Sequence, residues 1–235
     1  MAGLPRHRTR ARRARRRVTP TSPENDPLRR VILLRHGRTA WNEQGRWQGR
    51  LDVPIDDVGL RQAERAAALL VRDGSITRLV TSPARRAAQT TSVLKGAFDL
   101  AGRPLVRTED ARLVEIDMGA WAGLTHAEVA ASWPDASAAI ARGDDVRRGD
   151  GGETLAEATA RVEAGVRDAV SSATPGESVL VVTHGAVIRG VAGALAGLTP
   201  QTVRTSFRSI DNCHWVTLVE RRDGGWAIER WNAGE

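Results

Sequence analysis

The sequence predicts an α/β fold, a three-layer sandwich in which helices flank a mostly parallel central sheet. Two short segments, residues 31–34 and 179–182, carry the prediction because their apolar residues do not alternate with polar ones. Such segments are typical of strands that are buried on both faces of a parallel sheet. Segments with helical spacing of apolar residues alternate with the strands along the chain, which is the pattern of the α/β class.

The first half of the chain alternates strands and helices. The strand over residues 31–34 is followed by His36 and Gly37, and this glycine allows a sharp turn and a close approach of the backbone to a ligand. Residues 42–54 are expected to form a loop. The elements that follow are a helix over 57–72, a strand over 76–81, a helix over 84–97 and a strand over 105–107.

The second half begins with an expected loop over residues 113–123 and contains two helix starts. Thr125 and Glu128 have the spacing of a capping box, in which each side chain caps the backbone of the other residue. Thr154 and Glu157 repeat this spacing. The elements that follow the first box are a connection over 134–152, a helix over 155–172, a strand over 179–183, a helix over 186–198 and a hairpin of strands over 213–220 and 226–231.

Positive charge is concentrated at the N-terminus. The formal net charge is +7, and residues 1–28 carry +6 of it because they contain eight arginines and two acidic residues. This segment also contains several prolines and few apolar residues, so a disordered, arginine-rich tail is expected. Two interpretations of the tail are open. It either binds the phosphates of a nucleic acid or another anionic surface, or it is a solvated extension.

Composition also excludes several classes of protein. Cys213 is the only cysteine, so the chain forms no internal disulfide and no cysteine-based zinc site. No stretch is long and apolar enough to span a bilayer, and no hydrophobic segment near the N-terminus fits a secretory signal. A cytoplasmic protein without a membrane partner is therefore expected.

Chemically active side chains stand at the ends of the two apolar strands. Arg35 and His36 follow the first strand, and His184 follows the strand over 179–183. The carboxyl ends of neighbouring parallel strands meet at one edge of a sheet, where ligands bind in open α/β folds. We therefore expect His36 and His184 to lie close together and to form part of a ligand site.

Further motifs extend this pattern along the chain. They are Asn42, Arg46, Gln48, Gly49, Asp52 and Pro54; Ser82-Pro83-Ala84-Arg85-Arg86-Ala87-Ala88-Gln89-Thr90; Leu113-x-Glu115-x-x-x-Gly119-x-Trp121-x-Gly123; and Gly152-Glu153-Thr154. Together with Arg35-His36-Gly37 and His184-Gly185, this set resembles the histidine phosphatase superfamily, in its phosphoglycerate mutase-like branch. The resemblance covers about residues 29–232. It implies a phosphoglycerate mutase-like fold and a histidine phosphatase catalytic domain over residues 29–235.

The resemblance implies catalytic roles for four basic residues. His36 is the expected nucleophile, because neutral imidazole can form a covalent phosphohistidine. Arg35, Arg86 and His184 are expected to surround the phosphoryl oxygens. The two nearby guanidiniums also disfavour protonation of His36, which keeps it nucleophilic near neutral pH.

The remaining candidate residues complete the expected site. Glu115 is expected to protonate the leaving group and then to deprotonate the attacking water. Asn42, Gln48 and Gly49 are the expected substrate-binding residues. No cluster of acidic residues and histidines has the spacing of a metal site, so we expect a metal-independent enzyme without a cofactor.

Three functions are compatible with this site. The first is hydrolysis of a small phosphorylated metabolite of the sugar or glycerate type, since residues 123–126 resemble glucosyl-3-phosphoglycerate phosphatases and also fit broad-specificity phosphatases. The second is phosphoglycerate mutase activity, which is less compatible because the segment between Glu115 and Gly152 lacks a proline cluster. The third is a non-catalytic protein that binds phosphate or nucleic acid. The expected partner is a small phosphate ester, and a nucleic acid only through residues 1–28.

Overall fold

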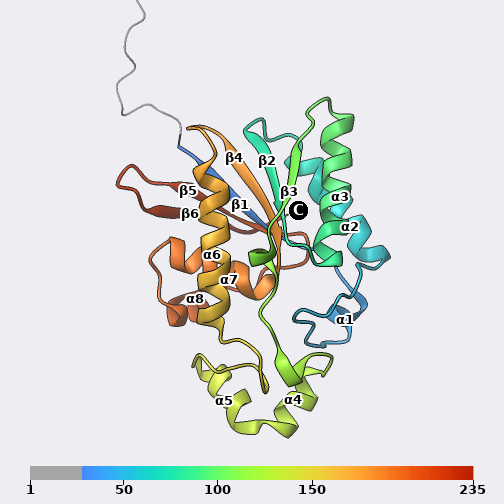
Figure 1. Cartoon of the computed structure of the whole chain (residues 1–235), viewed down its shortest axis with the longest axis vertical. Coiled ribbons are helices and arrows are strands. Elements are labelled where there is room, and N and C mark those ends of the chain that lie inside the picture. Colours follow the sequence, from blue (N-terminus) through green and yellow to red (C-terminus); the bar gives the residue numbers. More distant parts are fainter. Residues whose placement is uncertain (1–27, 235) are drawn as a thin grey trace, which may run out of the picture.

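The computed structural model describes residues 28–234, so the predicted tail lies almost entirely outside the described residues. A six-stranded sheet forms the centre of the molecule, in the order β3-β2-β4-β1-β5-β6 (Figure 1). The strands are β1 (Arg30–Arg35), β2 (Ile76–Thr81), β3 (Val106–Glu109), β4 (Ser178–Thr183), β5 (Trp215–Glu220) and β6 (Trp226–Ala233). Strands β3, β2, β4 and β1 pair in parallel, whereas β5 and β6 are antiparallel to their neighbours. The prediction of a mostly parallel sheet is confirmed.

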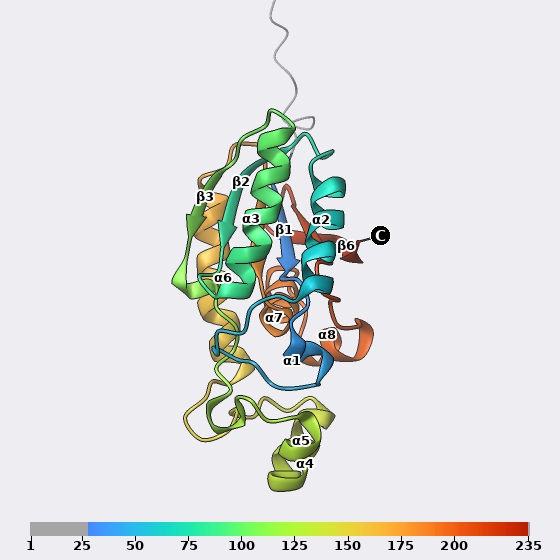
Figure 2. The same cartoon turned by 90° about the vertical axis from the view of Figure 1, so that its right-hand side faces the viewer.

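Helices cover both faces of the sheet and give the predicted three layers (Figure 2). Helices α2 (Asp57–Leu70) and α3 (Arg85–Leu100) pack on one face with Ile32 and Leu34. Helices α6 (Leu155–Ser171) and α7 (Gly185–Leu195) pack on the other face with Val31 and Leu33. Burial of these four residues on alternate faces explains why the central part of β1 is uniformly apolar. The other α-helices in the described part of the chain are α1 (Ala40–Glu43), α4 (His126–Ser132), α5 (Pro134–Arg142) and α8 (Pro200–Ser206).

The sheet brings three strand ends to one edge. Arg35 is opposite Thr183 in the register of β1 with β4, so His36 and His184 leave neighbouring strands at the same level. Ser82 follows β2 on the other side of β4, and its N–H donates to the carbonyl of Val182 at 2.9 Å. Figure 2 shows this end of β1 directed toward α1 and toward the segment that contains α4 and α5.

The structure differs from the prediction in three connections. Residues 134–152 are predicted as a connection, but α5 occupies the first part of this segment, because Pro134 starts a helix whose Ala136 and Ile140 pack against the core. Helix α8 was also missed, although Thr199 caps it and a proline starts it. A one-turn 3₁₀ helix, Ala111–Leu113, ends at the first residue of the loop predicted over 113–123, and a second one, Gly119–Trp121, lies within it.

In the part of the chain from residue 28 to residue 234, no helix is long and apolar enough to cross a membrane.

Candidate active site

The two strand-end histidines lie together, as predicted. The ring centroids of His36 and His184 are 5.2 Å apart, and the rings meet edge to face. Both side chains are buried, with exposed fractions of 3% and 0%. The two histidines therefore lie buried in the protein, where β1 and β4 end.

The hydrogen bonds of His36 determine its tautomer. Its Nδ1 lies 2.8 Å from the carbonyl oxygen of Gly37, and because a carbonyl can only accept, Nδ1 carries the proton. The lone pair of Nε2 then accepts from Nε of Arg86 at 3.2 Å. This arrangement leaves Nε2 as the nucleophilic atom of a neutral imidazole, and it lies beside a cation that is able to bind phosphate oxygens.

Burial lowers the pKa of His36 well below the usual value, and the charges of Arg86 and Arg35 lower it further. The pKa of His184 is also lowered, first by burial and then by Arg86, His36 and Arg35. The predicted effect of the two arginines is therefore correct in direction, but removal of the imidazole from water is the larger cause.

Arg86 is held rigidly in the first turn of α3. It is 1% exposed, and its two terminal nitrogens donate to the carbonyls of Leu51 at 2.8 Å and Gly49 at 2.7 Å. Gly49 has a φ of +53°, in the left-handed region that favours glycine, and a Cβ there would lie 3.0 Å from Cγ of Met118. The structure therefore places Gly49 as a support for Arg86, and the substrate-binding role expected for it stays a prediction.

Three predicted residues have buried polar atoms that no other atom of the described chain satisfies. They are Nε of Arg35, Oε1 of Gln48 and Nδ1 of His184. Arg35 is anchored by a hydrogen bond from Nη1 to the carbonyl of Ile210 at 2.7 Å, which leaves its remaining nitrogens for another partner. Buried polar groups normally have partners, so these three atoms are available to a polar ligand.

Glu115 lies beside the histidine cluster, which consists of His36, His184, Arg35 and Arg86. One carboxylate oxygen accepts from the N–H of Ala186 at 3.2 Å, at the N-terminus of α7, and the other accepts from the N–H of Ile116 at 2.9 Å. Its charge acts on both Arg35 and Arg86, which places the carboxylate within electrostatic reach of both guanidiniums. The structure therefore brings the predicted acid to the histidines from a loop about eighty residues away from His36 in the sequence.

Asn42 joins the cluster through a residue that the sequence did not indicate. The side-chain amide of Asn212 donates to the backbone carbonyl of His36 at 3.0 Å and to Oδ1 of Asn42 at 3.3 Å. All eight predicted site residues thus belong to one connected region, with Gln48 and Gly49 on the segment that supports Arg86.

Two further residues were missed as functional candidates. Oγ of Ser82 is 2.9 Å from Nε2 of His184, and Ser82 could have been found because it also directly follows a strand. Arg161 of α6 donates to the carbonyls of Val114 at 3.0 Å and Glu115 at 3.3 Å, and so fixes the backbone that carries the acid. Nothing in the sequence around Arg161 distinguishes it from an ordinary helix-surface arginine.

Gly37 is required by close packing of the backbone, whereas the close approach to a ligand expected for it stays a prediction. It is absent from the glycines with positive φ, so its backbone does not need the left-handed region. A Cβ on Gly37 would instead lie 2.6 Å from the carbonyl oxygen of Gly59. Glycine is required here because the loop after β1 packs directly against the first turn of α2.

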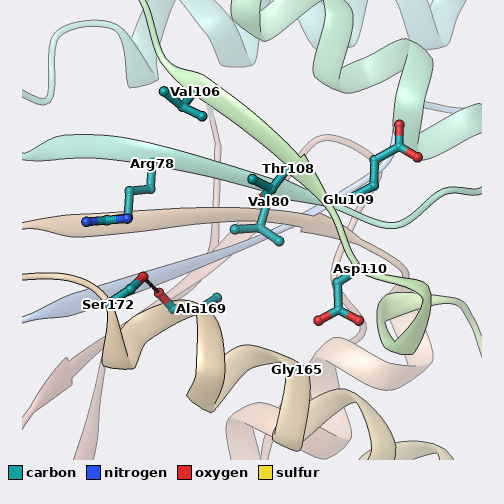
Figure 3. Close-up of a pocket in the computed structure, with 9 residues that line it drawn as sticks. All are labelled: Arg78, Val80, Val106, Thr108, Glu109, Asp110, Gly165, Ala169 and Ser172. Atoms are coloured by element: carbon teal, nitrogen blue, oxygen red, sulfur yellow. Dashed lines mark hydrogen bonds between the residues drawn. The ribbon is translucent and has the colours of Figure 1, made fainter.

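A separate pocket lies between β2, β3 and α6 (Figure 3). It is lined by Arg78, Val80, Val106, Thr108, Glu109, Asp110, Gly165, Ala169 and Ser172. None of these residues belongs to the histidine cluster, which is formed by other residues at the strand ends. Within residues 28–234, no group of three His, Cys, Asp or Glu side chains is arranged to hold a metal ion.

The buried histidines should make folding stability depend on pH. The lowered pKa values of His36 and His184 mean that the unfolded chain binds more protons than the folded chain below about pH 6.5. The free energy of unfolding should therefore fall between about pH 6.5 and 5, by up to about 1.4 kcal/mol per pH unit for each histidine. Urea unfolding at several pH values measures this slope. The double variant His36→Gln, His184→Gln should show a flatter dependence, and an unchanged slope would contradict the assignment.

The chain is similar to known phosphatases over most of its length. Residues 31–234 match the histidine phosphatase superfamily (branch 1). A glucosyl-3-phosphoglycerate phosphatase of Mycolicibacterium vanbaalenii is 34% identical over 223 residues, which cover 88% of this chain and 95% of the relative. The uncharacterized phosphatase PhoE of Bacillus subtilis is 32% identical, with 86% and 93% covered. The solved structure of a mycobacterial glucosyl-3-phosphoglycerate phosphatase in complex with VO3 has a TM-score of 0.78 at 33% identity, with 88% of this chain and 100% of that chain covered.

Proposed function

Because this chain belongs to the histidine phosphatase superfamily and is a phosphatase, we propose that it hydrolyses a small phosphomonoester through a phosphohistidine on His36. The observation that supports this most directly is the environment of Nε2 of His36, which is unprotonated, buried and 3.2 Å from Nε of Arg86. A phosphoryl group in transfer needs an in-line nucleophile and positive charge around its equatorial oxygens. The histidine cluster supplies both.

In the first step, Nε2 of His36 attacks phosphorus and the bond from phosphorus to the ester oxygen breaks. Arg35 and Arg86 bind the phosphoryl oxygens as fixed cations. His184 donates its Nδ1–H to a phosphoryl oxygen, since Oγ of Ser82 accepts from the N–H of Ala84 at 3.3 Å and can give its own hydrogen to Nε2. Glu115 gives its proton to the departing alkoxide, so that a neutral alcohol leaves.

In the second step, Glu115 acts in the reverse direction. Its carboxylate takes a proton from water, the water oxygen attacks phosphorus, and the bond from phosphorus to Nε2 breaks. Inorganic phosphate leaves and the neutral imidazole of His36 is restored. The contact of the Glu115 carboxylate with the N-terminus of α7 keeps it in one place for both proton transfers.

We propose a sugar-linked phosphoglycerate as the substrate, with other small sugar and glycerate phosphates as weaker ones. Support comes from the relatives named glucosyl-3-phosphoglycerate phosphatases, which match this chain over most of its length. The alternative is a mutase, in which a second hydroxyl rather than water receives the phosphoryl group. Because a mutase uses the same phosphohistidine, an activity assay is needed to distinguish it from a phosphatase.

The test is a panel of glucosyl-3-phosphoglycerate, 3-phosphoglycerate and p-nitrophenyl phosphate, each with and without 2,3-bisphosphoglycerate. We expect release of inorganic phosphate from all three, with the highest kcat/KM for the glucosyl compound and no effect of the bisphosphate. Isomerisation of 3-phosphoglycerate that requires the bisphosphate and releases no phosphate would contradict hydrolysis as the function. Equal kcat/KM values for all three would reject the proposed substrate while leaving hydrolysis intact.

A further inference from the structure

The amide of Asn42 has one defined orientation. Its Oδ1 lies 3.1 Å from the backbone N–H of Thr39 and 3.2 Å from Oγ1 of the same residue, in the capping box of α1. A backbone N–H can only donate, so the atom that faces it must be the amide oxygen. The Nδ2 group of Asn42 is therefore on the other branch of the amide, where it is available as a hydrogen-bond donor.

Asn212 connects the side chain of Asn42 to the backbone of the nucleophile. Its single Nδ2 group donates to Oδ1 of Asn42 at 3.3 Å and to the carbonyl of His36 at 3.0 Å. An amide NH₂ has two hydrogens, so both contacts can form at once. The backbone of His36 and the side chain of Asn42 are thus tied to the same atom, which is 170 residues from Asn42 along the chain.

The hairpin of β5 and β6 fixes the backbone next to Asn212. Oδ1 of Asn232 in β6 accepts from the N–H of Asp211 at 2.7 Å, and its Nδ2 donates to the carboxylate of Asp211 at 2.9 Å. On the other side of Asn212, the N–H of Cys213 donates to the carbonyl of Arg35 at 3.0 Å. Cys213 has a φ of +58°, which is unfavourable for this residue type and is maintained by contacts on both sides.

We propose that Asn212 is a positioning residue for phosphoryl transfer, which orients Asn42 so that Nδ2 of Asn42 donates to the phosphoryl group while His36 is held at the correct distance. The inference rests on the proposed function of His36. It gives the hairpin of β5 and β6, and Asn232 in particular, a part in catalysis even though neither strand carries a predicted catalytic residue. Asn212 acts through Asn42 and His36 and need not touch the substrate.

The test is a double-mutant cycle with p-nitrophenyl phosphate, using Asn212→Ala, Asn42→Ala and the combined variant of the full chain. We expect Asn212→Ala to lower kcat by about 10- to 100-fold with a smaller change in KM, the scale for partners that orient a ligand-binding group. In the Asn42→Ala background the same substitution should cost less, because the contact with Asn42 is already gone and only the contact with the carbonyl of His36 is left to lose. Equal losses in both backgrounds, or wild-type kcat in Asn212→Ala, would overturn the inference.

Asn212→Asp is the second variant, and it keeps the size of the side chain. The carboxylate of this variant faces two acceptors, the carbonyl of His36 and Oδ1 of Asn42, and it cannot donate to either. The activity of the variant should therefore be lowest at neutral pH, where the carboxylate is ionised. Protonation restores one O–H donor, so its kcat relative to that of the wild type should rise as pH falls from 7 to 5. A pH-independent ratio would contradict the positioning role. If His36→Ala is inactive while these expectations fail, only the role of Asn212 is rejected; if His36→Ala is active, the proposed function itself fails.

Discussion

Replacing His36 with alanine is expected to reduce kcat by about 10⁵- to 10⁶-fold, the scale observed when a covalent nucleophile is removed. The reason is that Nδ1 of His36 carries the proton while the lone pair of Nε2 faces the guanidinium of Arg86, so Nε2 is the nucleophile beside a cation that can bind phosphate oxygens. Without it, water would have to attack the ester directly in a site that is built around the imidazole. Phosphate release from p-nitrophenyl phosphate measures the effect.

The matched control is His126→Ala. His126 is exposed at the start of α4 and packs on Trp47, with ring centroids 4.4 Å apart. Its backbone N–H donates to the carbonyl of Gly45 at 3.1 Å, and neither Gly45 nor Trp47 follows a strand of the sheet, so this variant should retain wild-type kcat. Comparable activity of the two variants would show that His36 is not the nucleophile.

Replacing Glu115 with glutamine is expected to lower kcat on alkyl phosphates by about 10²- to 10⁴-fold, the usual contribution of a general acid or base. Glutamine can still accept from the N–H of Ala186, so the site should remain assembled. For p-nitrophenyl phosphate, kcat/KM should fall much less, because this parameter covers only the steps up to phosphoenzyme formation and nitrophenolate leaves without a proton.

The matched control here is Glu64→Gln, on the exposed side of α2, which should leave both parameters unchanged. If Glu115→Gln lowered kcat/KM for alkyl and nitrophenyl esters by the same factor, the carboxylate would not be acting as the proton donor. Full activity on alkyl phosphates would exclude Glu115 from the chemistry altogether.

The position of a site residue could be predicted from the sequence where that residue directly follows a buried parallel strand. The apolar residues at 31–34 and 179–182 predict strands that lie inside the sheet, and strands of this kind end at a common edge. That reasoning placed His36 beside His184, and the ring distance of 5.2 Å agrees with it. The same reasoning would also have placed Ser82 beside His184 if it had been applied to the strand over 76–81.

The contacts that support the site could not be predicted in this way. Arg161 reaches the backbone of Glu115 from the middle of α6, and Asn212 reaches His36 from the loop before an antiparallel strand. Each contact depends on how a helix or a hairpin packs against the sheet, which no local pattern encodes. The close packing of Gly37 on Gly59 is of the same kind, because it joins two segments whose separation depends on the tertiary fold.

The causes of the lowered pKa of His36 also differ in whether the sequence can predict them. The charges of Arg35 and Arg86 near His36 follow from the motifs, and they act in the predicted direction. The larger cause of the lowered pKa is burial, which depends on how completely the strands, α3 and the loop at 49–51 enclose the imidazole. Sequence patterns identify the charges but not the amount of water that the fold excludes.

The most direct test of the phosphohistidine is a rapid-quench experiment with the Glu115→Gln variant and p-nitrophenyl phosphate. Nitrophenolate can leave without the acid, but the attacking water lacks its base, so the phosphoenzyme should accumulate. We expect a burst of about one equivalent of nitrophenolate per site, and an acid-labile phosphoryl group on the peptide that contains His36. Release of nitrophenolate and phosphate together without a burst, or a phosphoryl group found on His184 instead, would contradict the mechanism.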